Sequence, residues 1–168
     1  MFGTQTGDAT TTGVGNTFIG TEAGGANTTA SSNTAVGYQA LDAVTTVGSL
    51  VAIRAAALGA NTDGTGGTAV GANALDANTT GNNNTAVGQN ALGANTTASS
   101  NVAFGVNAGD AITTSPGNTC LGTNAGSAIS TGNGENVCVG NNAGALMTTG
   151  QQNIIIGDNA VAGAALTG

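Results

Sequence analysis

The chain has 168 residues, of which 30 are glycine, 5% are charged and 2% are aromatic, with no histidine and one basic residue, Arg54. The formal net charge of −7 provides no lysine and arginine cluster for nucleic acid or an anionic membrane surface. Because histidine and lysine are absent, no Ser-His-Asp triad, activated thiol or lysine nucleophile can form, and we predict neither an enzyme nor a bound cofactor or metal.

The predicted elements repeat with a 17-residue period along the whole chain. Residues 1–15 form a partial coil, because residues 2–12 align with residues 104–114. Full coils start at residues 16, 33, 50, 67, 84, 101, 118, 136 and 153. The interval from 118 to 136 is 18 residues, which places a one-residue insertion near 132–135. We expect a single repeat domain over residues 1–168.

Each coil begins with a pattern such as Asn84-Thr-Ala-Val-Gly88, which predicts a short strand and a glycine turn. A second short segment centred on an alanine follows, and a polar return loop closes the coil. This leaves no room for a helix. The sequence therefore predicts an all-β protein, a parallel β-solenoid (β-roll) of about ten coils, which at about 4.8 Å per coil is a rod of roughly 50 Å.

Two positions of the repeat form ladders when the coils stack. Position eight, which indicates a close contact across a thin core, is alanine in every full coil: Ala23, Ala40, Ala57, Ala74, Ala91, Ala108, Ala125, Ala143 and Ala160. Position four, which we expect to hold the main large apolar group, is Ile19, Val36, Ile53, Val70, Val87, Phe104, Leu121, Val139 and Ile156. One or two such side chains per coil bury little area against the entropy of ordering the coil, which favours a parallel homo-oligomer.

The unit Asn33-Thr-Ala-Val-Gly-Tyr-Gln-Ala-Leu41 and its relatives resemble the head repeats of trimeric autotransporter adhesins and related repeats of bacteriophage tail fibres. The resemblance implies a left-handed, trimeric β-roll whose Val-Gly strand faces the threefold axis. It also implies attachment to a host-surface receptor or glycan, or a spacer role. The unit here is longer than the usual head repeat. We expect a structural shaft or head segment of a tail fibre, adhesin or extracellular filament.

Location and assembly follow from the remaining sequence features. Residues 1–12 lack a basic start and an apolar run, so no secretory signal is visible, and we expect an extracellular or virion-surface protein exported by another route. The apolar stretch 49–60 is too short to span a membrane. The chain is expected to be either a piece of a longer fibre protein or a subunit that stacks head to tail into a filament.

Several residues admit a functional and a structural interpretation. Cys120 and Cys138 share position three of adjacent coils and are either a disulfide rung or two buried thiols. Aspartates recur every 34 residues at Asp8, Asp42, Asp76 and Asp110, as calcium ligands or as solvated turn residues. The Asn-Thr-Thr triplets at Asn27, Asn78 and Asn95 fit either glycosylation or turn formation.

A column of threonines provides the alternative function. Position thirteen holds Thr28, Thr45, Thr62, Thr79, Thr96, Thr113 and Thr148, with Ser130 as the exception. A regular threonine array is typical of ice-binding β-solenoids, although this one falls in the predicted return loop rather than on a strand. Arg54 replaces the glycine of position five once, which suggests a local surface contact.

Overall fold

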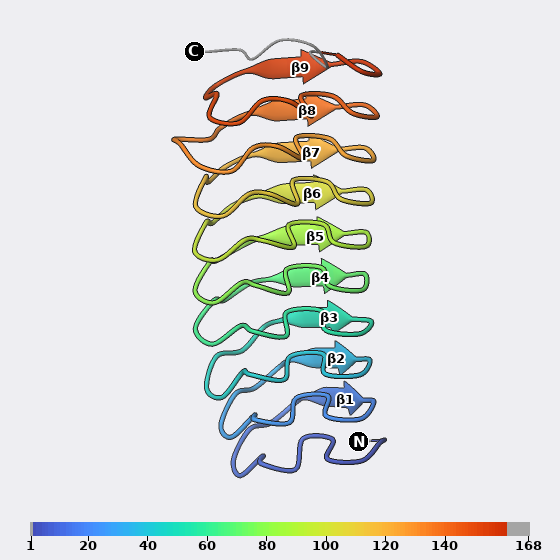
Figure 1. Cartoon of the computed structure of the whole chain (residues 1–168). Coiled ribbons are helices and arrows are strands. Elements are labelled where there is room, and N and C mark those ends of the chain that lie inside the picture. The colour runs from blue at the N-terminus through green and yellow to red at the C-terminus, as the bar shows by residue number, and fades with distance from the viewer. Residues whose placement is uncertain (1, 161–168) are drawn as a thin grey trace.

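The computed structural model describes residues 2–160, which form a stack of coils along one axis (Figure 1). Each full coil contributes one strand of three residues, and the strands are β1 (Thr17–Ile19), β2 (Thr34–Val36), β3 (Val51–Ile53), β4 (Thr68–Val70), β5 (Thr85–Val87), β6 (Val102–Phe104), β7 (Thr119–Leu121), β8 (Val137–Val139) and β9 (Ile154–Ile156). They form one parallel sheet in chain order. The described residues contain no helix, and the predicted parallel β-solenoid is confirmed. Met1 and the part of the last coil after residue 160 lie outside the described residues.

The coils stack in register, with each repeat position above the same position of its neighbour. Thr17 pairs with Thr34 and Ala52 with Ala69, both 17 residues apart. Between β7 and β8 the spacing is 18, because Cys120 pairs with Cys138. The extra residue lies in the return loop after Ser130, whose hydroxyl still donates to the carbonyl oxygen of Thr148, 18 residues on. A loop absorbs the insertion, so the strands keep their register.

The segment centred on alanine is a turn rather than a second strand. Its residues at positions seven and nine adopt left-handed backbone angles, as at Asn73 (φ 56°) and Leu75 (φ 52°). The backbone there still hydrogen-bonds from coil to coil: the N–H of Leu58 donates to the carbonyl oxygen of Ala74 at 3.1 Å, and that of Ala60 to Asp76 at 3.1 Å. Coil stacking therefore satisfies the backbone on the turn side as well as in the sheet.

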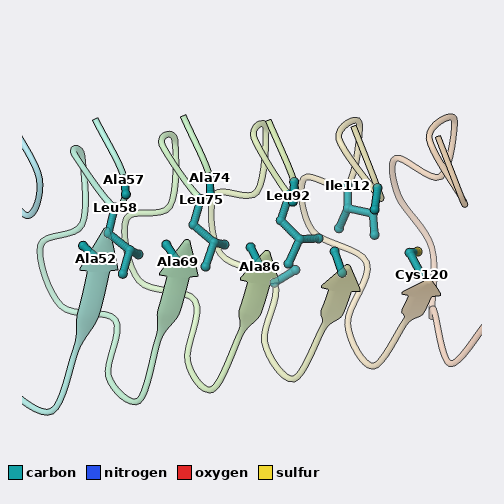
Figure 2. Close-up of a cluster of buried hydrophobic side chains, with 14 of the residues drawn as sticks. Ala52, Ala57, Leu58, Ala69, Ala74, Leu75, Ala86, Leu92, Ile112 and Cys120 are labelled. Carbon is teal, nitrogen blue, oxygen red and sulfur yellow. The ribbon is translucent and has the colours of Figure 1, made fainter. Parts of the chain in front are cut away.

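The core lies between the middle residue of each strand and the turn segment (Figure 2). Ala52, Ala69 and Ala86 project inward from β3, β4 and β5 toward Leu58, Leu75 and Leu92, which are the large side chains of the interior. The leucines belong to position nine of the coil. A thin core of alanine and leucine thus runs along the rod axis.

The coils compensate for a change at position nine with a change at position twelve. The coils of β6, β7 and β8 have glycine at position nine and a buried Ile112, Ile129 or Met147 at position twelve. A Cβ atom on Gly109 would lie 2.9 Å from Cδ1 of Ile112, so the isoleucine occupies space that leucine fills elsewhere. The interior stays filled because one large side chain replaces the other.

Asparagines at position one stabilise the corner before most strands, whereas Leu50 and Gly67 take this position before β3 and β4. Oδ1 of Asn101 accepts the N–H of Asn118 at 2.8 Å. Nδ2 of Asn84 donates to the carbonyl oxygen of Ala98 at 2.7 Å, across the same coil. These side chains satisfy backbone groups that lie outside the sheet ladder.

Candidate functional site: the outer face of the sheet

The position-four side chains line the outer face of the sheet. They pair in register from Ile19↔Val36 to Val139↔Ile156 and so form a continuous ladder. Phe104 is 56% exposed and Ile156 68% exposed, whereas Val70 is half-buried by its neighbours. The ladder is therefore a surface feature along the whole described rod.

This placement corrects the expectation that position four holds the main large apolar group. Strand residues alternate between the two faces of a sheet, and position three points inward. Position four then has to point outward, and positions nine and twelve supply the large interior side chains instead. The sequence contains an indication that positions nine and twelve share the interior. Leu92 and Asn95 of one coil are replaced by Gly109 and Ile112 in the next.

Further apolar side chains widen the outer face. Phe2 forms a bridge to Ile19, and Val102 and Ile154, the first residues of β6 and β9, occupy position two of their coils. All four are exposed, as is Tyr38 just after β2. We define the outer face as positions two and four of every full coil together with Phe2. All of these residues are apolar or threonine.

No charged side chain of the described residues lies on the outer face. The acidic residues occupy the turn segments and return loops, and they are Asp8, Glu22, Asp42, Asp63, Asp76, Asp110, Glu135 and Asp158. Arg54 follows β3 directly and is exposed at the edge of the face. The net charge of −7 is therefore segregated away from the apolar ladder.

The alanine column lies on the opposite side of the core from the strands. Ala23, Ala57 and Ala125 are 0% exposed, and the other members from Ala40 to Ala143 are equally buried. Ala160 is partly buried and packs against the same cluster. The column is a structural contact and offers no accessible chemistry.

The two cysteines lie in contact inside the rod. Cys120 and Cys138 are register partners on β7 and β8, and both are buried and free. A hydrogen bond with Cys138, together with burial, raises the pKa of Cys120, so its thiol stays protonated at neutral pH. In this state the pair fills the place that alanine takes in most other coils.

The aspartate column is explained by the alternation of aspartate and glycine at position ten. A Cβ atom on Gly25 would lie 2.9 Å from Oδ1 of Asp42, and one on Gly59 would lie 3.0 Å from Oδ1 of Asp76. The carboxylates of Asp42 and Asp76 thus lean over the preceding coil, where glycine leaves room for them. Among the described residues, no three or more His, Cys, Asp or Glu side chains are grouped so that they could hold a metal ion.

The Asn-Thr-Thr asparagines are buried and bonded. Nδ2 of Asn78 donates to Oδ1 of Asn61 at 2.7 Å and to the carbonyl oxygen of Gly81 at 3.1 Å. Asn27 and Asn95 occupy the same position and are also buried. A glycan cannot be attached to an amide enclosed in this way, so these triplets serve the turn.

The threonine column lies on the return loops, outside the sheet. The position-thirteen hydroxyls donate to the next coil, as Thr79 does to the carbonyl oxygen of Thr96 at 3.1 Å and Thr113 to Ser130 at 2.9 Å. The next residue of each coil, position fourteen, forms a second and fully exposed column: Thr12, Thr29, Thr46, Asp63, Thr80, Thr97, Thr114, Thr131 and Thr149. The sequence alone does not distinguish these two columns, because both positions hold threonine in most coils.

Comparisons with protein-family models, curated proteins and solved structures find no match to this chain. Within residues 2–160 no helix is long and apolar enough to cross a membrane.

Proposed function

We propose that the chain is a structural fibre segment that assembles side by side with parallel copies of itself through the outer face. The observation that supports this most directly is the uncharged apolar ladder along the rod. A second copy has the same repeat of about 4.8 Å per coil, so it can cover the ladder coil by coil. Elsewhere the acidic surfaces of two copies repel each other.

The number of chains and the biological setting are proposals from the sequence resemblance. Three parallel chains around a common axis would bury three outer faces against one another. Such a trimer would serve as a shaft or head of a tail fibre, adhesin or extracellular filament. Head-to-tail stacking of rods, in which the coils of one chain continue those of the next, is a second mode of self-assembly to be distinguished from the lateral one.

The test measures mass in solution by light scattering together with rod dimensions by electron microscopy. We expect discrete rods of three chains for the wild type. The variant Val87→Glu/Phe104→Glu places two charges on the outer face and should be a folded monomer, because an unpaired buried charge costs several kcal/mol. Thr80→Glu/Thr97→Glu is the matched control, since position fourteen naturally holds Asp63.

Either of two results would contradict the lateral assembly. The wild type could be a compact monomer, or the outer-face variant could keep the mass of the wild type. Long filaments in both variants would instead favour axial stacking.

Ice binding is the second candidate function, and the exposed column at position fourteen favours it. Its hydroxyls are spaced by the coil repeat and all are exposed. Against it, the column lies on bends rather than on a flat strand. Thermal hysteresis of the wild type that is lost in Thr80→Glu/Thr97→Glu and kept in Val87→Glu/Phe104→Glu would establish this function.

A further inference from the structure

A cavity of about 600 Å³ lies beside the one irregular coil. It is formed by the return loops of three successive coils, those of β6, β7 and β8, where Figure 1 shows one loop projecting beyond the others. Its polar lining consists of Thr114, Asn133, Glu135, Gln151 and Gln152. All of the lining residues are exposed, so the cavity opens widely to solvent, and its volume is within the range of small-molecule sites.

Three features that occur once in the repeat meet at this cavity: the only proline, Pro116, the only 18-residue coil, and a return loop built on Gly132 and Gly134. Gly134 is buried with φ 73°, and a Cβ atom there would meet the carbonyl oxygen of Pro116. The N–H of Glu135 donates to the same oxygen at 3.0 Å. The loop is thus seated on Pro116. The other coils form the rod without these features, so the solenoid does not require the cavity.

The lining selects against anionic and apolar ligands. Arg54 is the only basic residue of the chain and lies three coils away from β6, about 14 Å at the strand spacing. An anionic ligand would therefore meet Glu135 with no compensating charge. Pro116 is the one sizeable apolar group of the lining, which leaves little apolar surface for a hydrophobic ligand.

The same lining suits a ligand that carries several hydroxyl groups. Hydroxyl and amide side chains both donate and accept hydrogen bonds, as sugar hydroxyls do. Glu135 is held in place, because its Oε2 accepts a hydrogen bond from Nε2 of Gln152 at 2.9 Å. The residues Thr114, Asn133 and Gln151, which also belong to the lining, add a hydroxyl and two amide groups to this carboxylate.

We propose that this cavity binds a neutral saccharide of one or two rings. The inference rests on the proposed function, in which a fibre segment would use such a site for attachment. The binding is a property of one chain, because all the lining residues come from the same solenoid. A single open site of this size is expected to bind a monosaccharide with a dissociation constant on the order of 1 mM.

Saturation-transfer NMR with the full-length chain tests the proposal. The probes are glucose, galactose, mannose, N-acetylglucosamine and N-acetylgalactosamine, with N-acetylneuraminic acid as an anionic comparison. We expect at least one neutral sugar to bind more tightly than the anionic probe. Binding of none of the neutral sugars, or tighter binding of the anionic probe, would overturn the proposal.

Two variants locate the binding. Deleting Asn133 restores the 17-residue coil and removes the projecting loop. Gln151→Ser/Gln152→Ser introduces the serines that occupy the same positions at 31–32 and 99–100. Each should weaken binding about tenfold or more, the worth of one or two ordinary hydrogen bonds.

The matched control is Asn82→Ser/Asn83→Ser, which replaces two amide side chains with serine at the same repeat positions, two to four coils away from the coils that form the cavity, and should bind as the wild type does. Equal binding by all variants would place the sugar elsewhere and overturn the proposal. Sugar binding is measured independently of oligomeric mass. A monomeric protein that binds sugar would therefore contradict the proposed fibre assembly and support the proposed sugar site.

Discussion

At the scale of single residues, the backbone conformation of position five sets the strictest limit on side-chain choice. Its glycines have φ between 128° and 149°, as at Gly20 and Gly71. A Cβ atom on Gly88 would meet the carbonyl oxygen of Gly105 in the next coil. The coils approach so closely here that only glycine fits without displacing a neighbour.

Arg54 is the one residue that departs from this column, and it has φ 96°. We predict that Arg54→Gly raises the free energy of unfolding by about 1 kcal/mol, because an L-residue with a side chain is strained in this region. Urea denaturation at physiological salt, where the lost charge is screened, measures the change. Gly88→Ala should shift the midpoint the opposite way. An unchanged or lower midpoint for Arg54→Gly would mean that its side chain makes a stabilising contact.

Some residue assignments could be made from the sequence and others could not. The alanine column was visible because no larger residue replaces Ala74 or its equivalents in any coil. The orientation of Val70 was not, because Ala69 and Val70 are both apolar and either could face the core. The cavity was missed as well, since its shape depends on how Gly134 seats against Pro116, a contact between loops of different coils.

At the scale of the element, the 17-residue coil is the unit that folds and stacks. Each coil contacts only its two neighbours through the sheet, as shown by the chain-order pairing of β1 to β9. Such rods have stabilities that are sums over coils and their interfaces. The period was readable from the sequence, because every coil repeats the same contacts with the next.

We predict that deleting residues 67–83, one complete coil, leaves a folded and shorter rod. The deletion joins Gly66 to Asn84 and brings β3 beside β5 in the register that β3 and β4 have now. The dependence of unfolding free energy on urea should fall by about one tenth, in proportion to the surface lost. Circular dichroism and urea unfolding measure the outcome.

The control deletion removes residues 70–85 and leaves one extra residue inside a strand. A shift of one residue turns the inward side chains to the outer face, so this variant should unfold at lower urea with less cooperativity. The natural insertion is tolerated because it lies in the loop after Ser130. Equal stability of the two deletions would show that the strand register does not determine the fold.

At the scale of the whole molecule, the acids are spread along the rod and away from the outer face. Eight acidic residues and one basic residue give the net charge of −7. Burial raises the pKa of Asp76, and burial together with the nearby charge of Glu22 raises that of Asp42. Burial also raises the pKa of Asp110, although the backbone N–H groups of Asp110 and Ala111 oppose it.

These three shifts predict that the rod is more stable in mild acid than at neutral pH. A carboxyl whose pKa is raised by folding binds more protons in the folded than in the unfolded state, so the free energy of unfolding falls as the pH rises above the unfolded value of 3.8. The Tm should therefore be higher at about pH 4 than at about pH 7. The variant Asp42→Asn/Asp76→Asn/Asp110→Asn should show a smaller pH dependence and a higher Tm at neutral pH, whereas Asp63→Asn, on an exposed loop, should keep most of the dependence. A wild-type Tm that rises steadily from pH 4 to pH 7 would show that folding stabilises these carboxylates, and would contradict the prediction that their burial destabilises the fold.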